Sequence, residues 1–175
     1  MFQVGELIFY GGTGVCQITD VRAMDLLHTG VARPYYILKP LFQECTISAP
    51  ADSDKVFIRP VLTREEAEEL IDRIPFIQAE AYHSRMLHQL EEHYDAALKT
   101  HDCGTLLELT MSIYAKKQLL KDQRRKFGMV DERFLKRAEE LLFGEFSAAL
   151  GIPKEEVQPY IQSRVEALEA CQNQV

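Results

Sequence analysis

The residues whose types and spacing most clearly suggest chemistry are the cations between positions 116 and 126. Six of these eleven residues are lysine or arginine, and one is acidic. On a helix, Lys117, Lys121 and Arg124 would recur at i, i+4 and i+7 and share one face, which Arg125 extends. Such a row of cations can contact the phosphates of a nucleic acid backbone. The alternative is a solvated helix end, because cations also suit the negative end of the helix dipole.

Charge is distributed unevenly along the chain. The whole chain has a formal net charge of -7, which argues against a protein that is basic over its entire surface. Residues 111–141 nevertheless hold nine basic and five acidic side chains, a net charge of +4. Any contact with nucleic acid is therefore expected from this local patch.

The other reactive side chains form no pattern typical of catalysis or metal binding. His83, His88 and His93 recur every five residues, whereas two metal ligands on one helix face need a spacing of four. The glycines at 11–14 lack the spacing of a phosphate-binding loop and precede another strand instead of a helix. No Ser/His/Asp, Cys/His or GxSxG arrangement stands out. We expect no enzymatic activity, no metal and no cofactor.

Cysteine usage and the N-terminus bear on the compartment. The four cysteines are scattered without a CxxC pair, which fits a reducing environment. The N-terminus has no basic region followed by an apolar core, and no apolar run approaches the length that spans a bilayer. These features predict a cytoplasmic protein without a membrane segment.

The elements that must position these residues fall into two parts. From Phe2 to about Arg59, short β-rich runs are separated by glycines and prolines, as in hairpins and tight loops. The runs lie at residues 7–10, 14–18, 35–38, 46–48 and 56–58. They predict a small five-stranded barrel of SH3-like or Tudor-like type over residues 1–60.

After Pro60 the pattern changes to amphipathic helices. Thr63 and Glu66 form a capping box, which begins a helix that Pro75 ends. Further helices are expected at about 79–99, 105–125, 131–150, with Asp131 as its cap, and 153–169, with Pro153 at its first position. The expected fold class is α+β with two domains, a five-stranded β-barrel at 1–60 and an all-α bundle of about five helices at 61–175.

Several ordered motifs resemble one protein family. The opening MFQVGELIFYGGTGV at 1–15, YYILKP at 35–40 and IRPVL at 58–62 are similar to the first domain of CarD-like transcription regulators. That domain is shared with the polymerase-binding module of transcription-repair coupling factor. AEELL at 138–142 and LGIPKEEV at 150–157 resemble the closing helices of the clostridial branch. The resemblance covers nearly the whole chain.

The resemblance implies two contacts. The first domain of the family binds the lobe of the RNA polymerase β subunit, mainly through the strand that here reads Thr46, Ile47, Ser48. Ser48 stands where some relatives carry an arginine that pairs with the polymerase. The helical domain of the family touches the upstream edge of the transcription bubble, where a tryptophan wedges into the minor groove. This chain has no tryptophan, and the wedge position falls near His83, with Tyr82 beside it. An equal alternative is that Tyr82 packs inside the bundle.

The sequence thus predicts a monomeric transcription regulator that binds the polymerase β subunit and contacts promoter DNA without sequence specificity. It would modulate open-complex stability by binding one promoter state more tightly than the other. The expected contacts to the DNA backbone and minor groove come from Tyr82, His83, Arg85, Lys116, Lys117, Lys121, Arg124, Arg125 and Lys126. A function of another class stays open, a protein-only adaptor that binds polymerase or another partner without DNA contact.

Overall fold

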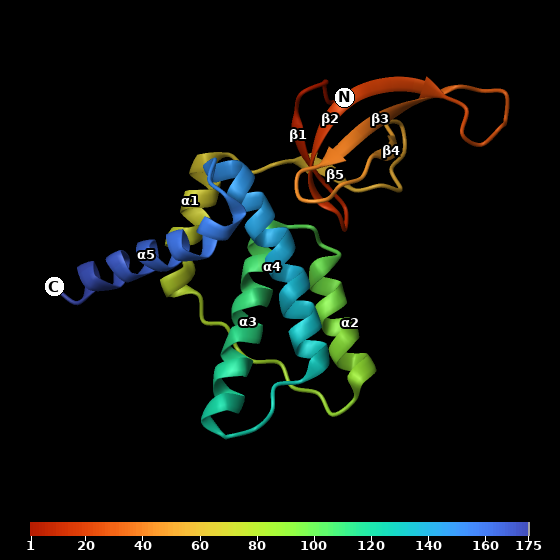
Figure 1. Cartoon of the computed structure of the whole chain (residues 1–175). Helices are drawn as coiled ribbons and strands as arrows, with labels where there is room; N and C mark the ends of the chain where they lie inside the picture. Colours follow the sequence, from red (N-terminus) through yellow and green to blue (C-terminus); the bar gives the residue numbers. More distant parts are fainter. Residues whose placement is uncertain (175) are drawn as a thin grey trace. The chain divides into compact units, whose positions relative to one another are not determined.

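The computed structural model describes residues 1–174, which divide into two compact units. The first unit spans Met1–Val61, and the second begins at Leu62. The first is a five-stranded antiparallel sheet, and the second contains five α-helices within the described residues. This content, drawn in Figure 1, confirms the α+β fold class.

The sheet of the first unit has the strand order β4-β3-β2-β1-β5. Successive side chains of a strand point to opposite faces, so alternate residues of neighbouring strands can share one core. That core contains Ile8, Cys16, Ile18, Tyr36, Leu38 and Ala49. The strands are β1 (Leu7–Tyr10), β2 (Gly14–Met24), β3 (Arg33–Pro40), β4 (Ile47–Pro50) and β5 (Ile58–Pro60).

The β2–β3 hairpin is longer than the sequence predicts. β2 was expected to end at Ile18, but it pairs with β3 as far as Met24 opposite Arg33, after a register shift between Ile18 and Asp20. Residues 19–24 are exposed or half-buried, so no apolar pattern marks them as strand. Backbone pairing with β3 extends the strand where burial does not.

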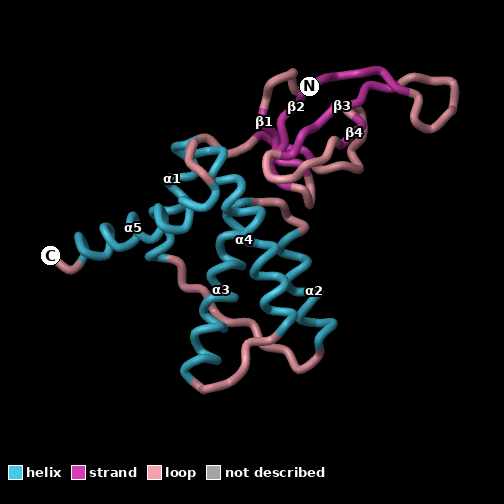
Figure 2. Tube along the Cα trace, viewed as in Figure 1, coloured by secondary structure: helices cyan, strands magenta, loops and turns pink. Residues whose placement is uncertain are grey.

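The second unit is helical, and Figure 2 shows its helices in cyan; α2, α3 and α4 pack against one another. Buried residues of these three helices make its main core: Leu90, Tyr94, Leu109, Ile113, Phe134, Leu135 and Ala138. The helices are α1 (Arg64–Asp72), α2 (Leu87–Leu98), α3 (Cys103–Asp122), α4 (Met129–Leu150) and α5 (Lys154–Gln172), with a short 3-10 helix η1 (Ile74–Phe76) after α1.

The start of α1 follows the prediction. Thr63 Oγ1 accepts a hydrogen bond from Glu66 N at 3.2 Å, and Glu66 Oε2 accepts one from Thr63 N at 2.8 Å. This reciprocal pair is the predicted capping box, and it satisfies two backbone donors that the first turn leaves open.

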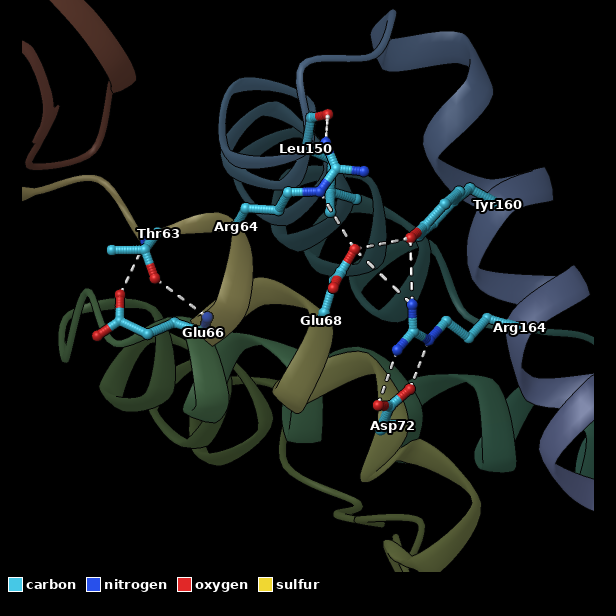
Figure 3. Close-up of polar contacts among 8 residues, drawn as sticks. All are labelled: Thr63, Arg64, Glu66, Glu68, Asp72, Leu150, Tyr160 and Arg164. Carbon is cyan, nitrogen blue, oxygen red and sulfur yellow. Dashed lines mark hydrogen bonds and ion pairs between the residues drawn. The ribbon is translucent and has the colours of Figure 1, made fainter.

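Polar contacts attach α5 to α1 (Figure 3). Arg164 donates to both carboxylate oxygens of Asp72, at 2.6 and 2.9 Å, and Tyr160 donates to Glu68 Oε1 at 3.3 Å. The hydrogen bond from Arg164 holds the pKa of Asp72 below its ordinary value, because it stabilises the carboxylate. Two helices at opposite ends of the helical unit's sequence are thereby joined.

Residues 77–86, called the strap below, differ from the prediction of a helix over 79–99. The helix begins only at Leu87, and the backbone is extended at Ile77 and Met86. Ser112 Oγ donates to the carbonyl oxygen of Glu80 at 2.6 Å. The strap is thus attached by side-chain contacts to α3, which helical periodicity within the strap cannot anticipate.

The ends of α3, α4 and α5 also differ from the prediction. α3 ends at Asp122, three residues early, because Arg124 adopts a left-handed φ of 54° and Arg125 N donates to Leu120 O at 2.7 Å. Gly128, and not Asp131, is the N-cap of α4. Pro153 occupies the cap position of α5 and not its first helical position.

Candidate functional site

The outer strand β4 offers an unpaired backbone edge. Within the described residues its one strand neighbour is β3, and Ala51 N, just past β4, donates to Pro34 O at 2.9 Å. Inward and outward backbone groups alternate along an antiparallel pair. The N–H groups of Ile47 and Ala49 therefore point toward β3, and that of Ser48 points outward. An edge of this kind can add a strand from a partner.

The three residues predicted to bind the partner lie together at this edge. Ile47 and Ser48 are the first residues of β4, and Thr46 directly precedes it. Thr46 and Ser48 are exposed, whereas Ile47 packs partly against the sheet core. Pro50, the other outward position in β4, has no N–H, so Ser48 supplies the outward backbone donor of the strand.

Five of the predicted cations form an exposed cluster, which we call the basic turn. Lys117 and Lys121 lie on the last turns of α3, and Arg124, Arg125 and Lys126 lie in the connection to α4. The predicted helical stripe does not extend to Arg124, because the helix has already ended. A loop, and not a helix face, presents three of the five cations.

Lys116 does not belong to this surface. It was expected to contact DNA with its neighbours, but it is buried, with 5% of its surface exposed. Its Nζ lies 2.8 Å from Asp131 Oδ1. A buried ammonium that is already paired cannot reach a phosphate without breaking an ion pair inside the protein.

Tyr94 completes the group around the Asp131 carboxylate. Its hydroxyl donates to Asp131 Oδ1 at 2.6 Å, so one oxygen accepts from both α2 and α3. Burial, and then the hydrogen bond to this carboxylate, raise the pKa of Tyr94 above its ordinary value. We call Lys116, Asp131 and Tyr94 the buried triad. It connects α2, α3 and α4.

Gly128 makes room for the triad. A Cβ atom at this position would lie 2.8 Å from Asp131 Oδ2, closer than real Cβ atoms come to a neighbour. Any larger residue would displace either the carboxylate or the start of α4.

The strap reaches the same end of the helical unit as the basic turn. Arg133 Nη2 of α4 lies 2.7 Å from Glu91 Oε1 of α2, so the N-terminal halves of these helices are neighbours. Figure 1 shows the α3–α4 connection and the part of the strap that leads into α2 at this end. His83 and Arg85 of the strap are exposed there. Two sequence-distant groups of predicted site residues are thereby brought to one end of the fold.

Tyr82 follows the packing alternative. Its ring stacks on that of His93 with a centroid distance of 3.7 Å and an interplanar angle of 9°. The side chain is half-buried against the main core of the unit. One face of the ring is therefore covered, and the ring is held by the bundle.

Among residues 1–174, no three His, Cys, Asp or Glu side chains gather as they would around a metal ion. His93, one of the three regularly spaced histidines, lies against Tyr82. No helix in this range is both long and apolar enough to cross a bilayer.

Comparison with known families identifies the first unit. Residues 2–62 match the family model of the CarD-like/TRCF RID domain. This range includes all five strands of the sheet. Residues 2–62 form a CarD-like/TRCF RID domain. The match confirms the family resemblance of the first domain, and β4 is accordingly the outer strand of an RID domain.

The RID domain points to interaction with RNA polymerase. The matched family is a polymerase-interacting domain and not an enzyme family. The match ends where the helical unit begins, so the helices have to be interpreted from their own geometry. No curated protein matches the chain.

The buried triad is the feature that sequence reasoning missed. A signal for it was present: Leu109, Ile113 and Leu120 lie on one buried helical stripe, and position 116 falls on that stripe between the last two. Lys116 was grouped with its charged neighbours in sequence, although helical spacing places it on the apolar face. No local pattern indicated that Asp131 and Tyr94 would meet it.

Proposed function

We propose that this protein is a transcription regulator that binds the RNA polymerase β subunit through its RID domain and contacts promoter DNA through its helical unit. It acts at the upstream edge of the transcription bubble and changes the lifetime of the open complex. The proposed role is that of a cytoplasmic monomer and needs no covalent chemistry and no cofactor.

The observation that carries the proposal is the RID match over residues 2–62. The open edge of β4 supports strand addition as the mode of binding, because Ser48 points a backbone N–H outward. Strand addition takes its affinity from main-chain hydrogen bonds, so it does not depend on an arginine at position 48.

The exposed basic turn and the exposed His83 and Arg85 support the DNA contact. Both groups lie at one end of the helical unit, so they can contact the same duplex. Tyr82 is packed in the bundle, which leaves His83 as the aromatic ring nearest the family's wedge position. Backbone contacts by cations are expected to dominate the affinity, since an imidazole offers less stacking area than an indole.

A binding experiment with purified components tests the proposal. The full chain should bind RNA polymerase and its isolated β subunit, and it should change the dissociation rate of open complexes on a linear promoter fragment. Failure to bind the β subunit would contradict the assigned partner. Binding without any effect on open-complex lifetime would contradict the assigned role.

A protein-only adaptor is the second candidate, and the net charge of -7 favours it. In that case the RID domain binds its partner and the helical unit makes no DNA contact. Ionic strength separates the two candidates, because DNA affinity carried by the basic turn falls steeply as salt is raised.

A further inference from the structure

The Lys116–Asp131 ion pair closes a loop, and the whole basic turn lies inside that loop. The two residues are 15 positions apart in the chain. Lys117, Lys121 and the three cations of the α3–α4 connection all fall between them. The pair joins α3 to α4 where the chain leaves one helix and enters the next.

The Asp131 partner of the pair has further neighbours. Tyr94 of α2 donates to the Asp131 oxygen that also accepts from Lys116. Gly128 has no side chain, so the Asp131 carboxylate can occupy space that a side chain at position 128 would fill. Lys117 Nζ lies 5.5 Å from the centre of the Phe127 ring, so the end of α3 also contacts the connection to α4.

A buried ion pair is a costly way to join two helices if stability is the sole result. Well-packed apolar side chains of similar volume often do as well or better, because the desolvation of two charges offsets much of their attraction. Such pairs are directional, however, and they select one relative placement of the groups that they connect. Here the two groups that the pair connects are the helices on either side of the basic turn.

We propose that Lys116, Asp131, Tyr94 and Gly128 are positioning residues for DNA contact. They hold the basic turn in one conformation before DNA arrives, so that less conformational entropy is lost when the cations meet the phosphates. This inference rests on the proposed DNA contact of the helical unit. The four residues themselves do not touch DNA.

The test compares three variants of the full chain. Lys116→Met with Asp131→Leu removes the buried pair and leaves the net charge and every exposed cation unchanged. Arg164→Met with Asp72→Leu is the matched control, because it removes an ion pair between α1 and α5, also at constant net charge. Charge reversal of Lys117 and Lys121 to glutamate tests the DNA contact itself. Affinity for an upstream-fork promoter DNA is measured at several salt concentrations and at a temperature where all the proteins are folded.

The buried-pair variant should bind this DNA about three- to tenfold more weakly than the wild type, because the turn must be ordered on binding. Amide hydrogen exchange over residues 123–127 should be faster in that variant. The Arg164/Asp72 variant should match the wild type in both measurements. Equal losses of affinity in the two pair variants would overturn the proposal, since the effect would then follow general stability.

The experiment separates a failure of the proposed DNA contact from a failure of the proposed positioning role. If charge reversal weakens binding but the buried-pair variant binds like the wild type, the DNA contact stands and the positioning role is wrong. If charge reversal has no effect, the DNA contact is wrong, and the positioning role is wrong with it. If the buried-pair variant does not fold, Tyr94→Phe and Gly128→Ala replace it, and unchanged affinity in both would overturn the proposal.

Discussion

Lys116 Nζ lies 2.8 Å from Asp131 Oδ1, and the two side chains are 7% and 6% exposed. The pair connects α3 with the first turn of α4 inside the helical unit. Removing one charge of such a pair leaves the other buried without a partner, which costs far more than removing both. The pair therefore has separate consequences for stability and for the basic turn.

Lys116→Ala should destabilise the helical unit by about 3–5 kcal/mol, because it leaves the Asp131 carboxylate buried without its cation. Lys116→Met with Asp131→Leu removes both charges but also the acceptor of the buried Tyr94 hydroxyl, so this double variant should lose about 1–3 kcal/mol. Urea unfolding followed by circular dichroism measures both changes. Lys117→Ala, one residue along and exposed, serves as the control. Equal losses from Lys116→Ala and Lys117→Ala would contradict the importance of the pair.

Ser48→Pro should weaken binding of the RID domain to RNA polymerase, because it removes the N–H that β4 directs outward. The expected loss of binding free energy is about 1–3 kcal/mol, the cost of leaving one hydrogen bond unmade. Pull-down and titration with the isolated β subunit measure it.

Two further variants serve as controls for Ser48→Pro. Ser48→Ala keeps the N–H and should bind normally. Ile47→Pro removes an N–H that points toward β3, so it should reduce the stability of the domain as well as binding. If Ser48→Pro bound as tightly as Ser48→Ala, strand addition at this edge would be excluded.

Lys121→Glu should reduce the salt dependence of DNA binding. Each phosphate contact that is lost lowers the slope of log affinity against log salt by about 0.9. Lys99→Glu makes the same charge change at the C-terminal end of α2, away from the basic turn, and should leave the slope nearly unchanged. Identical slopes for Lys121→Glu and the wild type would remove this residue from the DNA surface.

His83→Trp should lengthen the lifetime of the open complex, because an indole at this exposed position can stack on an unpaired base. The expected gain is on the order of 1–3 kcal/mol, the range for one base–aromatic stack. Tyr82→Phe keeps the stack on His93 and should change little. A His83→Trp protein with an unaltered open-complex lifetime would mean that the strap does not approach the bubble.

The Arg164–Asp72 pair should contribute to stability at neutral pH and lose that contribution in acid. The folded-state pKa of Asp72 is depressed below its ordinary 3.8, so the contribution is present above that value and disappears as the pH falls through the lower folded-state pKa. Asp72→Asn should therefore destabilise the unit at pH 7 by about 1 kcal/mol or less, since the pair is partly exposed. Unfolding of both proteins as a function of pH should converge in strong acid. A difference that persists there would assign the effect to something other than this charge.

Much of the first unit follows from local sequence. Alternating apolar residues, together with glycines and prolines between the runs, are enough to predict five strands, because each strand buries one face. Two strands differ from the prediction in their bounds: β2 extends six residues beyond its predicted end, and β5 begins at Ile58, where the predicted run ends. The family resemblance adds the RID domain, and the match over residues 2–62 confirms it. The edge position of β4 could be expected, but which of its N–H groups points outward depends on the register with β3, which strand propensity does not contain.

Some helix boundaries also follow from local sequence, whereas others depend on tertiary contacts. The capping box of Thr63 and Glu66 is local, and it was predicted correctly. Residues 79–86 of the strap were predicted to be the start of a helix over 79–99. The Ser112 and His93 contacts that hold it extended come from α2 and α3 and cannot be read from residues 77–86 alone.

The sequence by itself determined the two-part architecture, the identity of the first part and the presence of one basic segment in an acidic chain. These depend on the order of residue types along the chain, since burial pattern and net charge are properties of short segments. Only the tertiary structure decided which of the cations are available. Lys116 and Lys117 are adjacent in sequence, yet the packing of α2 and α4 against α3 buries the first beside Asp131 and leaves the second in water. The physical reason is that a helix turns about 100° per residue, so neighbours in sequence face different surroundings.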